Sequence, residues 1–212
     1  MLPQGRILLC LAMTVCMAFV AGCKSEYRPQ AEAHSAAARL DQAPLVRPFP
    51  LVAMDNPMVV EFTLPPPGRS GSSTLFLGIR VRGEDGLKSL DAASEVRDLG
   101  LPAQLKLERL DGQQSTLVPL VRVESVAGGP ARIEPIGPTG HVAGGWLDNV
   151  DHQSLQSAGL EPAGSHYTQV ALAWAQGQAP GRYRLSIQLL APDRRLSSTP
   201  AELLVAYVNK SK

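Results

Sequence analysis

Three histidines and three carboxylates in one stretch of the chain could do chemistry, because neutral imidazoles and a carboxylate together can bind zinc. The six residues are His141, Asp148, Asp151, His152, Glu161 and His166. The histidine spacings, eleven residues from 141 to 152 and fourteen from 152 to 166, match no compact ligand motif. Asp148 and Asp151 could bind calcium, but the chain lacks the glycine turn and closing glutamate of a calcium loop. We therefore expect solvated histidines, no metal and no cofactor.

Serine hydroxyls are the other candidates for catalysis, as nucleophiles that a neighbouring base activates. Three serines lie in the polar turn Ser70-Gly71-Ser72-Ser73, and Ser165 directly precedes His166. The chain contains no Gly-x-Ser-x-Gly motif, and no base stands near the turn in the sequence. The sequence therefore predicts a protein without catalytic activity. A hydrolytic or metal-dependent enzyme that uses residues 126–166 is the alternative.

Trp146 and Leu147 are the residues best suited to bind a partner, since they follow two glycines, Gly144 and Gly145. Exposed tryptophans often supply much of the binding energy at protein interfaces. The alternative is that both side chains fold back and cover the end of the domain. Trp174 stands inside an alternating apolar segment, so we expect it in the core.

Cys23 has a thiol, a nucleophile that could accept a lipid. It ends the sequence Val20-Ala21-Gly22-Cys23, which completes an apolar run from Ile7 to Val20 after one basic residue, Arg6. The run would be roughly 21 Å long as a helix, against a hydrocarbon core of about 30 Å. It is therefore typical of a signal peptide rather than of a membrane span.

Val20-Ala21-Gly22-Cys23 resembles the lipobox of the bacterial prolipoprotein family. The resemblance implies cleavage before Cys23, a diacylglycerol thioether on its sulfur and acylation of its new amino group. Two or three acyl chains hold a protein firmly in a membrane, because each buried CH₂ adds roughly 0.8 kcal/mol. Lys24 stands where an aspartate would favour the inner membrane, so the resemblance implies the outer membrane, facing the periplasm. The alternatives are an inner-membrane or surface location, an ordinary signal peptide cut near Ala21, and an uncleaved anchor.

Cysteine and charge content exclude several classes of function. Cys10 and Cys16 would leave with the signal peptide, so the mature protein would have no disulfide, no thiol catalysis and no cysteine metal site. The chain has 20 basic and 19 acidic residues and only 5% aromatic residues. Nucleic acid is therefore not the expected partner, because neither a basic patch nor a set of stacking aromatic side chains is present.

Composition divides the chain into three parts. Residues 1–22 are the expected signal peptide, and residues 23–50 are a lipidated N-terminus followed by a tether rich in alanine and proline. Residues 51–212 are the expected domain, in which residues 126–166 form a long glycine-rich connection. Connections of that length are often functional, so a site is expected there.

The domain has mainly the two-residue hydrophobic period of β-strands. Seven strands are predicted, at residues 58–64, 74–82, 101–110, 117–125, 167–174, 183–190 and 203–208. Asp111-Gly112 predicts a hairpin between the third and fourth strands, because this pair accepts the positive φ of a tight turn. Seven short strands with turn-rich connections predict an all-β antiparallel sandwich.

One segment has a different period and predicts a short helix. Leu87, Leu90, Val96 and Leu99 recur near helical spacing, with Asp91 as the expected cap and Gly100 as the expected end.

Four segments resemble a family of uncharacterised bacterial lipoproteins that have an immunoglobulin-like domain. They are Leu77–Arg82, Asp91–Gly100, Leu105–Arg109, and Pro180-Gly181-Arg182-Tyr183-Arg184-Leu185 with the closing strand. The resemblance spans residues 50–208 and implies a fold and a cell-envelope location, but no activity.

Together these observations predict a lipid-anchored envelope protein that binds a protein partner and does not catalyse a reaction. Some small envelope lipoproteins are immunity proteins against toxins delivered into the periplasm, and others assist envelope complexes. The enzyme described above is the alternative, and a purely structural envelope protein is the third.

Overall fold

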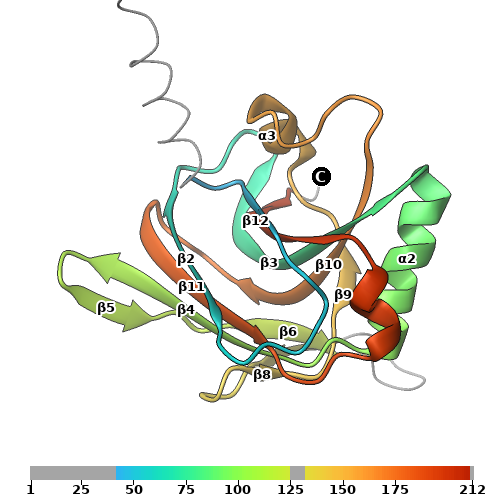
Figure 1. Cartoon of the computed structure of the whole chain (residues 1–212). Helices are drawn as coiled ribbons and strands as arrows, with labels where there is room; N and C mark the ends of the chain where they lie inside the picture. Colours follow the sequence, from blue (N-terminus) through green and yellow to red (C-terminus); the bar gives the residue numbers. More distant parts are fainter. Residues whose placement is uncertain (1–41, 125–131, 211–212) are drawn as a thin grey trace, which may run out of the picture. The chain divides into compact units, whose positions relative to one another are not determined.

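Two antiparallel β-sheets pack face to face in the computed structural model, which describes residues 42–124 and 132–210 (Figure 1). The predicted all-β sandwich is confirmed. The expected signal peptide, Cys23 and the expected tether up to residue 41 lie outside the described residues, as does the segment 125–131. Within the described residues, no helix has the length and apolar character needed to cross a bilayer.

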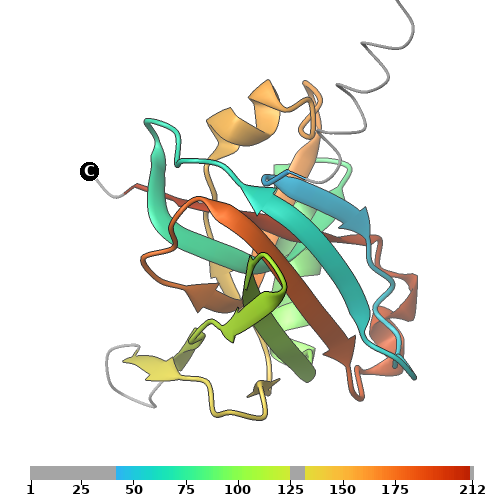
Figure 2. The ribbon, with the colours of Figure 1, turned by 90° about the vertical axis from the view of Figure 1, so that its left-hand side faces the viewer.

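The larger sheet has seven strands. Its order is β1 (Leu45–Pro48), β12 (Ala201–Asn209), β3 (Gly71–Gly83), β10 (His166–Ala175), β6 (Val121–Glu124) and β7 (Arg132–Pro135), and β9 (Trp146–Asp148) also pairs with β10. The smaller sheet has the order β2 (Met58–Leu64), β11 (Gly181–Leu189), β4 (Ala103–Asp111) and β5 (Gln114–Leu117), and β8 (His141–Val142) pairs with β4. Figure 2 shows β2, β11 and the β4–β5 hairpin side by side.

Alternating apolar side chains of both sheets meet in the main core, as the two-residue period predicts. The core includes Leu77 and Ile79 from the larger sheet and Leu105 and Leu185 from the smaller sheet, each at most 2% exposed. Tyr183 is also buried, and its hydroxyl donates to the carbonyl oxygen of Ala179 at 2.7 Å. A tyrosine that bonds back to the preceding corner in this way is characteristic of immunoglobulin-like sandwiches.

The described residues form twelve strands rather than about seven. Six strands, β1, β5, β6, β7, β8 and β9, have only two to four residues, too few to show a clear period in the sequence. The Asp111-Gly112 hairpin is present, with Asp111 opposite Gln114 and Gly112 at φ 64°.

The predicted strand 117–125 is wrong as a single strand. Val118 donates its N–H to the carbonyl of Leu107 in the smaller sheet, whereas Val121 pairs with Trp174 in the larger sheet. Pro119 stands between them and has no N–H for a strand ladder. The chain therefore passes from one sheet to the other at this proline.

The predicted helix is α2 (Gly86–Leu99), which ends at Gly100 as expected. Its cap is Asp85, not Asp91, because the Asp85 carboxylate accepts the N–H of Lys88 at 2.8 Å. Of the four apolar residues at helical spacing, Val96 is buried and Leu99 packs against the main core, whereas Leu87 and Leu90 are 73% and 43% exposed. The fully buried residues of the helix are Ser89, Ala93 and Val96.

Close packing of α2 explains this choice of face. A Cβ at Gly83 would lie 2.2 Å from the backbone nitrogen of Ser89, so the helix meets β3 almost backbone to backbone. Only small side chains fit at such a contact, and the Ser89 hydroxyl is satisfied by Thr168 at 3.0 Å.

Two expected boundaries differ in the structure. The sandwich already includes the residues just after 41, because Leu45 pairs with Val205 and both Leu45 and Phe49 are 1% exposed. The expected tether to residue 50 is therefore too long. The expected long connection is also divided from residue 132 onward by β7, β8, β9 and α3 (His152–Ser157).

Candidate functional site

The outer face of the larger sheet, which points away from the main core, is apolar and carries a second cluster of buried side chains. Its members are Phe76, Val150, Leu155, Ala171, Trp174, Leu204 and Ala206. The segment that follows β9 and includes α3 lies over part of this face and contributes Val150 and Leu155. We call residues 149–165 the cover segment. Such a segment is needed because both faces of a sheet must be shielded from water when both are apolar.

Buried polar contacts hold the cover segment in place. Asp151, which is 1% exposed, caps α3 and accepts the Ser70 hydroxyl at 2.6 Å. Burial alone would raise the pKa of the Asp151 carboxyl, but hydrogen bonds from Ser154 and Ser70 outweigh it and place the pKa below its usual value. At the other end of the segment, Arg80 donates to the carbonyl of Leu160 at 2.7 Å.

The cover segment does not reach the part of the sheet formed by β6 and β7, and a hollow of about 350 Å³ remains there. We call it the tryptophan groove. It is lined by Ser72, Thr74, Val121, Val123, Ile133, Trp146, Asp148, Trp174, Gln176, Val208 and Asn209. Ile133 at its margin is 63% exposed, which is high for a large apolar side chain.

Strand register brings the two tryptophans to this groove. Trp146 lies opposite Ala171, and Trp174 lies opposite Val121, so β9 and β6 follow one another along the same edge of β10. The pairing of β10 with β3 shifts between Ala171 and Ala173, which is a β-bulge. The extra residue turns Trp174 to the same face as Ala171, whereas strict alternation would place it in the main core.

Asp148 is the charged group of the groove. Its Oδ2 accepts the indole N–H of Trp174 at 2.7 Å, and its Oδ1 accepts the backbone N–H of Asn149 at 2.7 Å. Trp146, beside it, is half-buried. The groove therefore combines an apolar floor, two indole rings and one oriented carboxylate.

The side chains of the two predicted partner-binding residues lie on opposite faces of β9. Trp146 lines the groove, but Leu147 points to the opposite face of β9 and packs against the main core. Trp174 is buried as expected, 7% exposed, but in the second cluster rather than the main core. Val121, Val123 and Ile133 were not predicted as site residues; Val121 and Val123 alternate with charged residues in the sequence, but Ile133 shows no such pattern.

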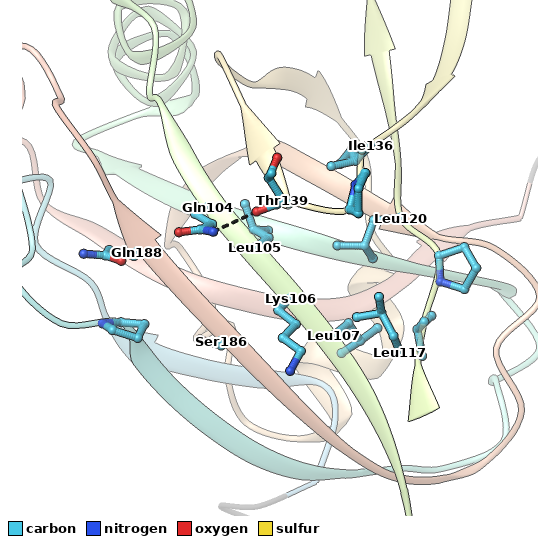
Figure 3. A pocket seen from close by; sticks show the side chains of 16 residues that line it. Gln104, Leu105, Lys106, Leu107, Leu117, Leu120, Ile136, Thr139, Ser186 and Gln188 are labelled. Carbon is cyan, nitrogen blue, oxygen red and sulfur yellow. Dashed lines mark hydrogen bonds between the residues drawn. The ribbon is translucent and has the colours of Figure 1, made fainter. Parts of the chain in front are cut away.

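A second hollow, of about 310 Å³, lies on the outer face of the smaller sheet, and we call it the Lys106 pocket (Figure 3). One wall is polar, with Gln104, Lys106, Ser186 and Gln188, and the other is apolar, with Leu117, Leu120 and Ile136. No sequence pattern marks this pocket, because its walls come from segments that meet only in the folded sheet.

Most polar side chains of the Lys106 pocket already bond within the protein. Gln104 donates to the carbonyl of Thr139 at 2.8 Å, as the dashed line in Figure 3 shows. Gln188 donates to the carbonyl of Met54 at 2.7 Å, and the Lys106 ammonium lies 2.9 Å from a carboxylate oxygen of Glu108. These contacts leave the pocket less able to recognise a ligand than the tryptophan groove.

The predicted candidates for catalysis meet only in pairs, and the three histidines lie on different elements. His141 is on β8 and His166 begins β10, while the ring of His152 lies 2.9 Å from the Glu161 carboxylate. In residues 42–124 and 132–210, no three side chains of histidine, cysteine, aspartate or glutamate come together as metal ligands would. The Ser70 hydroxyl donates to Asp151 and Gln153, so it lies beside a carboxylate and an amide rather than an imidazole.

Comparisons with known proteins give no functional relative. No family model matches the chain, and no curated protein matches it. A solved structure of a protein from Sulfurospirillum deleyianum aligns with 80% of this chain and 100% of its own, at 12% identity and a TM-score of 0.37.

Proposed function

We propose that this protein is a lipid-anchored envelope protein that binds a protein partner through the tryptophan groove and catalyses no reaction. Its lipid would be attached to Cys23 and would hold it in the outer membrane, facing the periplasm. The partner would be a periplasmic toxin, which the protein would neutralise as an immunity protein, or a component of an envelope complex.

The groove itself is the observation that carries the proposal. Trp146 is half-buried, Ile133 is 63% exposed, and both lie over apolar side chains of the same sheet face. Interface hot spots are enriched in tryptophan and sit in pockets from which the partner excludes water. A rigid apolar hollow with such a rim suits an inserted side chain of a partner.

Co-purification from intact envelopes tests the proposal. The tagged, lipidated protein is isolated and its partners are identified by mass spectrometry, for the native chain and for Trp146→Ala. A stoichiometric partner is expected with the native chain and a loss of about tenfold or more with Trp146→Ala.

Val59→Ala is the matched control, because Val59 is an exposed apolar side chain, 56% exposed, on the smaller sheet. It should retain the partner. A partner that binds Trp146→Ala as well as the native chain would show that the groove is not the site. Enzymatic activity in the purified protein would contradict the non-catalytic proposal.

The lipid anchor needs a separate test. Cys23→Ser should abolish labelling by radioactive palmitate and leave an unprocessed precursor in the membrane fraction. Continued labelling of the N-terminal region in this variant would contradict the lipobox interpretation.

A further inference from the structure

The tryptophan groove has an uneven distribution of charge. Asp148 carries the only charge among the eleven residues that line it, and neither lysine nor arginine is among them. The remaining lining is apolar, aromatic or neutral and polar. A ligand that places a cation there would therefore meet an opposite charge and no repulsion from the lining.

Asp148 differs from most acidic side chains on the described strands, which are paired with a lysine or an arginine. Glu61 pairs with Arg184, and Glu202 pairs with Arg80. Among the ion pairs between described residues, none includes Asp148. Its charge is therefore balanced by no basic side chain of the described part of the chain.

The carboxylate of Asp148 is held in place and still has capacity to bind. The Trp174 indole and the Asn149 backbone each donate to one of its two oxygens. A carboxylate has about four lone-pair sites, so about two remain for an incoming donor. The two existing bonds fix the direction in which those sites point, which reduces the ordering cost of binding.

The indole rings favour the same kind of ligand. The face of an aromatic ring attracts a cation, and tryptophan does so most strongly. Arginine adds a planar guanidinium that stacks on rings and donates two parallel hydrogen bonds to a carboxylate. Its aliphatic stem would pack against Val121, Val123 and Ile133, which form the apolar side of the groove.

We infer that the tryptophan groove recognises a basic side chain of its protein partner, an arginine, with the guanidinium at Asp148 and the stem along the valines. This inference rests on the proposed function, because it names the chemistry of the partner at the same site.

Intrinsic fluorescence offers a direct test, because the chain has two tryptophans and both line the groove. The purified protein is titrated with N-acetyl-arginine amide through the millimolar range, and with the citrulline analogue, which has the same shape and no charge. A saturable change in emission is expected with the arginine derivative and not with the citrulline derivative. Equal responses, or no response to either, would overturn the inference.

Asp148→Asn and Asp111→Asn form a matched pair of variants. Asparagine at 148 keeps an oxygen acceptor for the Trp174 indole and loses only the bond from the exposed Asn149 backbone, so the fold should be retained, as thermal unfolding will check. Asp148→Asn should abolish the response to the arginine derivative. Asp111→Asn removes the same charge at the tip of the β4–β5 hairpin and should leave the response unchanged. An undiminished response in Asp148→Asn would overturn the inference.

Co-purification separates this inference from the proposed function. Loss of the partner with Trp146→Ala and a loss of about tenfold or more with Asp148→Asn would support both. Loss with Trp146→Ala but full retention with Asp148→Asn would overturn the arginine inference and leave the proposed function standing. Retention with both variants would overturn both.

Discussion

The two outer faces of the sandwich differ sharply. The outer face of the smaller sheet is charged and solvated where Glu61 bonds to Arg182 and Arg184 on the neighbouring strand, and most polar side chains of its Lys106 pocket are bonded within the protein. The outer face of the larger sheet is apolar around Phe76 and Trp174, and a separate segment covers much of it. Both faces belong to antiparallel sheets, so only side-chain chemistry makes them different.

This difference indicates where binding is expected. A solvated, ion-paired sheet face needs no partner, because water and the paired side chains satisfy its charges. An apolar sheet face is stable only where another part of the protein or a partner shields it from water. The cover segment ends before β6 and β7, and the tryptophan groove is the part of that face which stays open.

The largest effect expected from this comparison is on stability. Phe76 is fully buried in the second cluster, so Phe76→Ala should lower the free energy of unfolding by about 3–5 kcal/mol. Val59→Ala, on the outer face of the smaller sheet, should change it by less than about 0.5 kcal/mol. Urea unfolding of both variants measures the difference. Equal losses of unfolding free energy in the two variants would show that the two outer faces do not differ in how much their side chains stabilise the fold.

Gly145→Ala should have the next largest effect, because the added Cβ would clash with β10 directly before Trp146. A Cβ at Gly145 would lie 2.4 Å from Cγ1 of Val170 and 3.0 Å from the carbonyl oxygen of Ala171. We expect a loss of about 1–3 kcal/mol from overpacking, together with a shifted tryptophan emission spectrum, since Trp146 follows directly. Gly112→Ala is not a suitable control, because Gly112 has φ 64°. Gly137→Ala, where a Cβ meets nothing within 4 Å, is the matched control.

Asp151→Asn tests how the cover segment is held. The pKa of Asp151 is lowered in the folded protein, so its ionised form stabilises the fold above its unfolded pKa, and this contribution disappears as pH falls through the folded value. We expect the variant to lose about 1–3 kcal/mol at neutral pH, and the difference from the native protein to shrink below about pH 4. Thermal unfolding at several pH values measures this, and a difference independent of pH would contradict it.

Glu61→Gln should have the smallest effect. Glu61 is 42% exposed, and its contacts with Arg182 and Arg184 are at the solvated surface. Hydrogen bonds from Arg184 lower the pKa of Glu61, but exposed ion pairs contribute little to stability. The thermal midpoint should stay within experimental error of the native protein. A large fall would mean that the outer face of the smaller sheet is not simply solvated.

Local sequence patterns predicted much of the fold. The two-residue period located β2, β3, β4, β10, β11 and β12, because each has enough residues to show alternation. The Asp111-Gly112 turn and the end of α2 at Gly100 also follow from residues close together in the chain. The buried face of α2 was not predictable from its own sequence. It depends on the close approach of the helix to Gly83 in β3, where only small side chains fit.

For the site, the sequence alone made Trp146 a binding candidate and Cys23 the expected lipid-bearing residue, since both predictions depend on residue types and immediate neighbours. Only the tertiary structure decided that Leu147 faces inward, that Trp174 joins Trp146, and that Asp148 stands between apolar walls. The bulge between Ala171 and Ala173 is the physical reason for the position of Trp174. One extra residue in β10 reverses which face Trp174 occupies, and pairing with β3, far away in the chain, fixes the position of that residue.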